Sequence, residues 1–110
     1  MLITTEPSSI KTYGQGYIRQ FGWVLTSFGC PIRGDVPLSE VAAMGRWWVD
    51  QGIDYLGFGD TTGSSNPLQV SHFYEYMDAQ GFDRDMVVVH FHDTRGWGVA
   101  NSMVALTHGF

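Results

Sequence analysis

Two histidines separated by a single residue follow an apolar run in the last third of the chain. Val87–Val89 are β-branched and predict a buried strand of a parallel sheet, and His90 and His92 come at its end. Side chains at i and i+2 of a strand share a face about 6–7 Å apart, so both imidazoles should point the same way. Neutral imidazole is a common metal ligand. We therefore favour a metal-binding pair over the alternative of two polar residues where a strand leaves the core.

The composition limits the classes of function. The 110 residues are enough for one modest domain, and a formal net charge of −5 argues against nucleic acid and anionic membrane surfaces as partners. No apolar run approaches the ~20 residues of a membrane span. The single cysteine, Cys30, excludes an internal disulfide and is typical of a reducing compartment. The N-terminus has neither a secretory nor a transit-peptide pattern, so we expect a cytoplasmic protein.

A strand–helix pattern that occurs three times must position the histidines. It follows a loose lead-in over residues 1–16, in which 10–13 indicate a short helical remnant. We expect strands over 17–28, 53–58 and 86–91. Helices are expected from Pro37 to Gly52, from Asn66-Pro67 to Gly81 and from about Trp97 to Thr107. Their expected inward side chains are Val41, Met44 and Trp48, then Val70, Phe73, Tyr74 and Met77, and finally Val99, Met103 and Leu106.

Three residues able to do chemistry recur at the same point of each unit. Cys30, Asp60 and His90 are spaced 30 residues apart, which is about the length of one strand–helix–strand repeat. Each follows or ends its strand, so all three should gather at the C-terminal edge of a parallel sheet. That edge carries the active site in α/β barrels and in open α/β sheets.

Three further polar side chains have structural as well as functional interpretations. Asp93 is equally suited to orienting an imidazole and to capping the following helix. His72 is expected on the exposed side of its helix. His108 is expected at a helix C-terminus, where the helix dipole favours its charged form.

Four motifs in order carry a resemblance to a known family. They are Phe28-Gly29-Cys30-Pro31, Gly59-Asp60-Thr61-Thr62-Gly63, His90-Phe91-His92-Asp93-Thr94-Arg95-Gly96 and Ala100-Asn101. Together they resemble the hydroxymethylglutaryl-CoA lyases, members of a superfamily of divalent-metal TIM-barrel lyases and synthases. The resemblance covers residues 16–110.

The resemblance implies an α/β fold that is part of a (β/α)8 barrel. A whole barrel needs about 250 residues, so residues 17–110 correspond to about three β/α units, strands five to seven. In the family, Mg²⁺ or Mn²⁺ is held by the two histidines, an Asp of the first strand and an Asn near the eighth. A mobile loop supplies a catalytic Cys.

Each family role is carried over only to a matching residue of this sequence. His90 and His92 become the metal ligands, with His90 also moving protons. Asp60 becomes a catalytic residue in the substrate pocket, and Thr61 and Thr94 become substrate-binding residues. Cys30 matches the strand-end cysteine rather than the loop cysteine. Asn101 lies in a helix and is interpreted as packing or capping, and Arg33 departs from the family pattern.

The implied reaction is a retro-Claisen cleavage of hydroxymethylglutaryl-CoA to acetyl-CoA and acetoacetate. Two histidines alone make a weak site for a hard ion, so we expect this chain by itself to bind metal poorly and turn over little. Two alternatives stay open, a non-catalytic truncated fragment and a related Claisen-type synthase using another acyl-CoA. We also expect a homo-oligomer, or the missing part of the barrel, to cover the open sheet.

Overall fold

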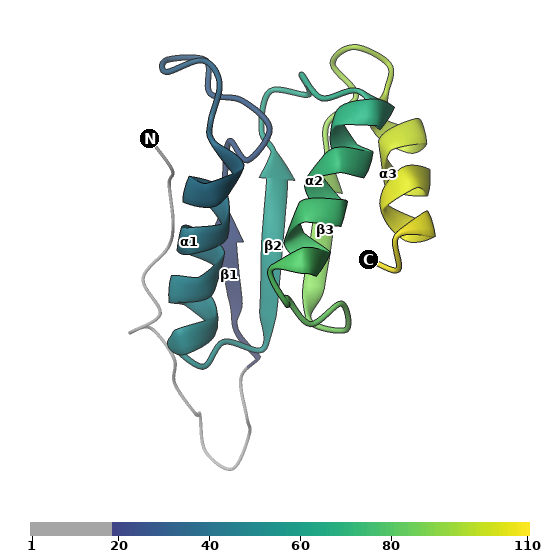
Figure 1. Ribbon diagram of the computed structural model, residues 1–110. Helices are drawn as coiled ribbons and strands as arrows, with labels where there is room; N and C mark the ends of the chain where they lie inside the picture. The colour runs from purple at the N-terminus through teal and green to yellow at the C-terminus, as the bar shows by residue number, and fades with distance from the viewer. Residues whose placement is uncertain (1–18) are drawn as a thin grey trace.

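The computed structural model describes residues 19–110, and the expected lead-in lies outside the described residues. Strands and helices alternate through this range (Figure 1). The three strands are parallel and adjacent in chain order, and the three helices pack on one face of the sheet (Figure 1). The elements are β1 (Phe21–Val24), α1 (Leu38–Asp50), β2 (Tyr55–Asp60), α2 (Pro67–Ala79), β3 (Val87–Phe91) and α3 (Gly98–Thr107). The three expected strand–helix units are therefore confirmed.

The period of two along each strand separates a helix-facing side from an opposite side. Val24, Leu56 and Phe58 are fully buried between the sheet and the helices. Trp23 lies on the opposite side, where its register partner is Gly57. A Cβ at Gly57 would lie 2.1 Å from the Trp23 ring, so only glycine lets this indole lie across β2.

The inward faces expected for α1 and α2 are confirmed. Val41 and Trp48 of α1 are buried, as are all four expected side chains of α2. Asn66 caps α2, because its side-chain oxygen accepts a hydrogen bond from the backbone N–H of Gln69 at 2.9 Å. None of the helices within residues 19–110 has the length and apolar character that crossing a membrane requires.

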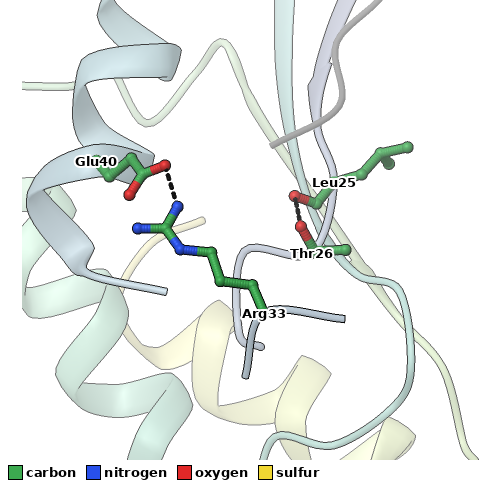
Figure 2. A network of polar contacts seen from close by, with 4 residues as sticks. All are labelled: Leu25, Thr26, Arg33 and Glu40. Atoms are coloured by element: carbon green, nitrogen blue, oxygen red, sulfur yellow. Dashed lines mark hydrogen bonds and ion pairs between the residues drawn. The ribbon is translucent and has the colours of Figure 1, made fainter. Parts of the chain in front are cut away.

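The first strand is shorter than the expected 17–28, of which 17 and 18 lie outside the described residues. It ends at Val24 because Thr26 takes a left-handed conformation with φ of 54°. The Thr26 hydroxyl donates to the carbonyl of Leu25 at 2.7 Å (Figure 2). Farther along, the guanidinium of Arg33 pairs with Glu40 of α1 and lowers the pKa of that carboxyl group (Figure 2).

The expected inward face of α3 is wrong. Val99, Met103 and Leu106 are 78%, 55% and 62% exposed. The buried residues of α3 are instead Gly98, Asn101 and Ala105. Small residues on this side allow α3 to lie close to α2 and β3, and Asn101 is held there by hydrogen bonds to Ser65. The large apolar side chains are left on the outer side.

Candidate active site

The loops that follow the three strands gather at one edge of the sheet (Figure 1). Cys30, Asp60 and His90 all lie at or beyond the C-terminal ends of their strands, as their spacing predicts. They do not share one pocket. His90 lies on the side of the sheet away from the helices, Asp60 is buried on the helix-facing side, and Cys30 lies in the loop after β1.

The two histidines converge on a single point. The Nε2 atoms of His90 and His92 are 3.0 Å apart, with the ring planes nearly perpendicular at 87°. His92 Nδ1 lies 2.7 Å from the carbonyl oxygen of Thr61. Because a carbonyl oxygen only accepts hydrogen bonds, His92 must carry its proton on Nδ1. The lone pair of a neutral His92 then lies on Nε2, directed at His90.

The histidine pair belongs to a cavity of about 320 Å³ whose lining surface is mainly apolar. Trp23 and Leu25 come from β1 and the residue after it, Gly59 and Thr61 from β2 and its end, and the two histidines from β3 and its end. The Trp23 ring meets His90 edge-on at a centroid distance of 6.0 Å. Sequence reasoning missed Trp23 and Leu25 as lining residues. Their alternation with buried Val24 was the signal that could have placed them on this face.

The donor set of the pair fits part of a metal centre. Two adjacent ligands of an octahedral ion with bonds of about 2.1 Å lie about 3.0 Å apart, which matches the observed separation of the Nε2 atoms. Across residues 19–110, no cluster of three or more His, Cys, Asp or Glu side chains is arranged to hold an ion. The described part of the chain therefore offers two ligands rather than a full shell.

Asp93 caps the helix that follows it. Its carboxylate accepts a hydrogen bond from the backbone N–H of Gly98 at 2.8 Å, at the start of α3. Of the two interpretations left open by the sequence, this contact supports helix capping.

Asp60 does not line the cavity that holds the histidine pair. Its carboxylate is 1% exposed and accepts hydrogen bonds from the backbone N–H groups of Ser64 and Ser65, both at 3.1 Å. The hydroxyl of Ser65 donates a third bond at 2.5 Å. Since Asp60 is two residues after the buried Phe58, it shares the helix-facing side of β2.

Cys30 and Thr94 line a second cavity of about 490 Å³, together with Thr62, Ser64 and Arg95. Backbone N–H groups of Arg33 and Ile32 hydrogen-bond to the Cys30 thiol and lower its pKa. The two expected substrate-binding threonines are therefore separated, with Thr61 beside the histidines and Thr94 beside Cys30.

His72 and His108 line neither the cavity of the histidine pair nor the cavity of Cys30. His72 is exposed on α2, as expected. His108 follows the last residue of α3, and its Nε2 is 2.9 Å from the hydroxyl of Ser71 on α2. Neither the position of His72 nor the contact of His108 indicates a chemical role.

Comparison with known proteins gives this geometry a family. Residues 8–110 match the family model described as HMGL-like. The chain belongs to the HMGL-like family. It is 40% identical over 87 residues to the hydroxymethylglutaryl-CoA lyase YngG of Bacillus subtilis, an alignment that covers 79% of this chain and 29% of that protein.

Solved structures of HMG-CoA lyases match the fold. The enzyme of Bacillus subtilis superposes with a TM-score of 0.81 and 38% identity over 84% of this chain and 30% of its own. An HMG-CoA lyase of Acinetobacter baumannii, solved with coenzyme A and 3-methylmalate, superposes with a TM-score of 0.74 and 34% identity. That alignment covers 81% of this chain and 29% of the other. This chain of the HMGL-like family thus spans under a third of these relatives. Its three parallel β/α units are the expected partial TIM barrel.

Proposed function

We propose that this chain is part of a divalent-metal-dependent lyase that cleaves hydroxymethylglutaryl-CoA into acetyl-CoA and acetoacetate. The observation that carries the proposal is the pair of Nε2 atoms 3.0 Å apart at the C-terminal edge of the sheet. Membership of the HMGL-like family and the names of the matched lyases support the reaction class. The relative solved with coenzyme A supports an acyl-CoA as substrate.

His90 and His92 would hold a Mg²⁺ or Mn²⁺ ion through their Nε2 atoms. The Thr61 carbonyl keeps the His92 proton on Nδ1, which leaves the Nε2 lone pair available to the ion. When bound, a divalent cation supplies Lewis-acid stabilisation of the negative charge that develops on the substrate oxygen. The remaining ligands of such an ion would come from parts of the barrel outside the described residues.

The cleavage is a retro-Claisen reaction in which the chain's own residues bind substrate and move protons. A base removes the proton of the 3-hydroxyl group, the bond between carbons 2 and 3 breaks, and the acetyl-CoA enolate takes up a proton. We assign proton movement to His90 through its other ring nitrogen, Nδ1, because the Nε2 lone pair would be taken by the ion. The hydroxyl of Thr61 accepts a bond from the Thr26 N–H at 2.8 Å and retains its own proton to donate to substrate. Trp23 and Leu25 exclude water from one wall.

Asp60 and Thr94 have less direct roles in this proposal. Because the Asp60 carboxylate is buried and already accepts three hydrogen bonds, we assign it the positioning of the loop after β2 rather than proton transfer. Thr94 borders the neighbouring cavity with Cys30, where it would contact a more distant part of the substrate.

The first experiment measures Mn²⁺ binding to the purified chain by titration followed with electron paramagnetic resonance. We expect weak binding, because two ligands fill one third of an octahedral shell, and we expect His92→Gln to abolish it. His72→Gln is the matched control, since that imidazole is exposed on α2. Binding that survives His92→Gln but disappears in His72→Gln would exclude the histidine pair as the metal site.

The second experiment tests the reaction itself. Residues 19–110 replace the matching segment of the Bacillus subtilis lyase, and the chimera is assayed for acetyl-CoA release with Mn²⁺. We expect turnover by the chimera, a loss of about 100-fold or more in His92→Gln, and little or none from the present chain alone. A folded chimera that binds Mn²⁺ without cleaving hydroxymethylglutaryl-CoA would favour the non-catalytic or synthase alternatives.

A further inference from the structure

A chain of buried polar groups connects α3 with the histidine pair. The side-chain NH₂ of Asn101 donates to the backbone carbonyl of Ser65 at 3.2 Å and to its hydroxyl at 3.0 Å. The same hydroxyl donates to Asp60 at 2.5 Å. All three side chains are buried, with exposed fractions of 0% for Asn101 and Ser65 and 1% for Asp60. Groups removed so completely from water are held in one arrangement by their mutual hydrogen bonds.

The series of hydrogen-bonded polar groups that begins at Asn101 ends at the turn that supports His92. The Asp60 carboxylate binds the N–H groups of Ser64 and Ser65, and the Asp60 carbonyl accepts from the N–H of Gly63 at 3.2 Å. Residues 60–65 therefore form a turn that is held together by hydrogen bonds to Asp60. Thr61 lies inside this turn, and its carbonyl is the acceptor for His92 Nδ1 at 2.7 Å.

We propose that Asn101 is a positioning residue for the histidine pair: through Ser65 and Asp60 it fixes the 60–65 turn, whose Thr61 carbonyl keeps the His92 proton on Nδ1. The inference rests on the proposed function, in which His92 Nε2 must present a lone pair. It assigns a role to a helix residue with no direct contact to either imidazole. The outer hydrogen-bond partner of a ligating histidine sets its tautomer and ring orientation, and Asn101 acts one step farther out.

The isosteric change Asn101→Asp replaces the donor NH₂ by an acceptor facing two oxygens of Ser65. Ser65→Ala removes the shared hydroxyl with the loss of one atom and keeps the backbone N–H bond to Asp60. Ala105→Gly is the matched control, because Ala105 is buried on the same side of α3 and makes no side-chain hydrogen bond. It loosens α3 without touching the polar chain.

The test is long-range ¹H–¹⁵N NMR on the full chain labelled with ¹⁵N-histidine, free of metal, at a pH where the imidazoles are neutral. His92 is assigned from the signal that disappears in His92→Gln. We expect the wild type and Ala105→Gly to give the pattern of an Nδ1–H imidazole. In Asn101→Asp and Ser65→Ala we expect a mixture of both tautomers, and a Mn²⁺ affinity about 10-fold lower.

Two results would overturn the proposal. An unchanged Nδ1–H pattern in Ser65→Ala, with an unchanged circular dichroism spectrum, would show that the turn holds His92 without the polar chain. Loss of the pattern in Ala105→Gly as well would reduce the effect to general loosening of α3. If Asn101→Asp does not fold, the His92 tautomer pattern of Ser65→Ala decides between these outcomes. Since the tautomer is read without metal or substrate, these results are independent of whether the chimera cleaves hydroxymethylglutaryl-CoA.

Discussion

The hydroxyl group of Tyr74 is buried without compensation. Tyr74 is fully buried on α2, its hydroxyl has no hydrogen-bond partner among residues 19–110, and burial raises its pKa. A buried polar group without a partner costs about 1–3 kcal/mol. We therefore expect Tyr74→Phe to raise the free energy of unfolding by about 1 kcal/mol, measured by urea denaturation.

Tyr55→Phe is the comparison for this change. The Tyr55 hydroxyl is partly exposed and accepts a hydrogen bond from Arg19 at 2.8 Å, so its removal should leave stability unchanged or slightly lower. A loss of stability in Tyr74→Phe would contradict the prediction and indicate a partner for that hydroxyl beyond the described residues.

Among single residues, the sequence predicted the positions of His90 and His92 on the sheet better than the position of Asp60. The His-x-His spacing fixes a common face whatever the surroundings, and the structure brings the two Nε2 atoms to 3.0 Å. The 30-residue spacing placed Asp60 at the correct edge but says nothing about which face it occupies. The parity with Phe58, two residues earlier, contained that information. The contacts to Ser64 and Ser65 depend on the turn conformation, which no pattern in the sequence specifies.

Within β2, two glycines on the same face differ sharply in the space around them. A Cβ at Gly57 would lie 2.1 Å from the Trp23 ring, whereas a Cβ at Gly59 would meet Leu25 at an ordinary 3.4 Å. We expect Gly57→Ala to displace Trp23 and to lower the free energy of unfolding by about 1–3 kcal/mol, because a packed ring must move. Urea denaturation monitored by circular dichroism measures this change in the free energy of unfolding.

Gly59→Ala is the control in the same strand, with the same change in backbone freedom. Gly59→Ala should change the free energy of unfolding by much less than Gly57→Ala does. Equal losses at the two positions would mean that strand conformation, rather than the Trp23 ring, decides the requirement for glycine.

Among the elements, α3 shows why helical periodicity alone can choose the wrong face. Val99, Met103 and Leu106 form an apolar stripe at helical spacing, and this pattern predicted that the stripe faces inward. The structure buries the side that carries Gly98, Asn101 and Ala105. Close packing against α2 selects small side chains, and the hydrogen bonds of Asn101 to Ser65 fix the rotation of the helix. Helical periodicity describes the apolar side and the small-residue side of α3 equally well, and it does not indicate which side packs against α2 and β3. For α1 and α2, the apolar residues expected inward are the ones that pack in the core.

At the scale of the whole molecule, the described sheet is covered on one side. The helices pack on one face (Figure 1), and Phe21 and Trp23 lie on the other with Tyr55. Phe21 stays 46% exposed. The chain spans under a third of the matched lyases, in which the same segment is part of a longer chain. The face of the sheet opposite the helices is therefore apolar and partly open to solvent in the described part of the chain.

Such a surface should drive association of this chain with itself. Val99, Met103 and Leu106 form a second exposed apolar surface on the outer side of α3, and exposed apolar patches mark interaction sites. We expect sedimentation velocity to show a concentration-dependent shift from monomer to larger species. The double change Val99→Glu and Met103→Glu should move that shift to higher concentration, because charged side chains resist burial without a partner.

The control for this experiment is Leu68→Glu. Leu68 is 67% exposed near the start of α2, outside the stripe, and its replacement adds one negative charge, half that of the double change, without altering α3. If Leu68→Glu weakens association by half as much as the double change or more, net charge rather than the apolar stripe controls the association. A wild-type chain that remains monomeric throughout the concentration range would contradict the prediction. The open face of the sheet would then be compatible with a stable monomer in solution.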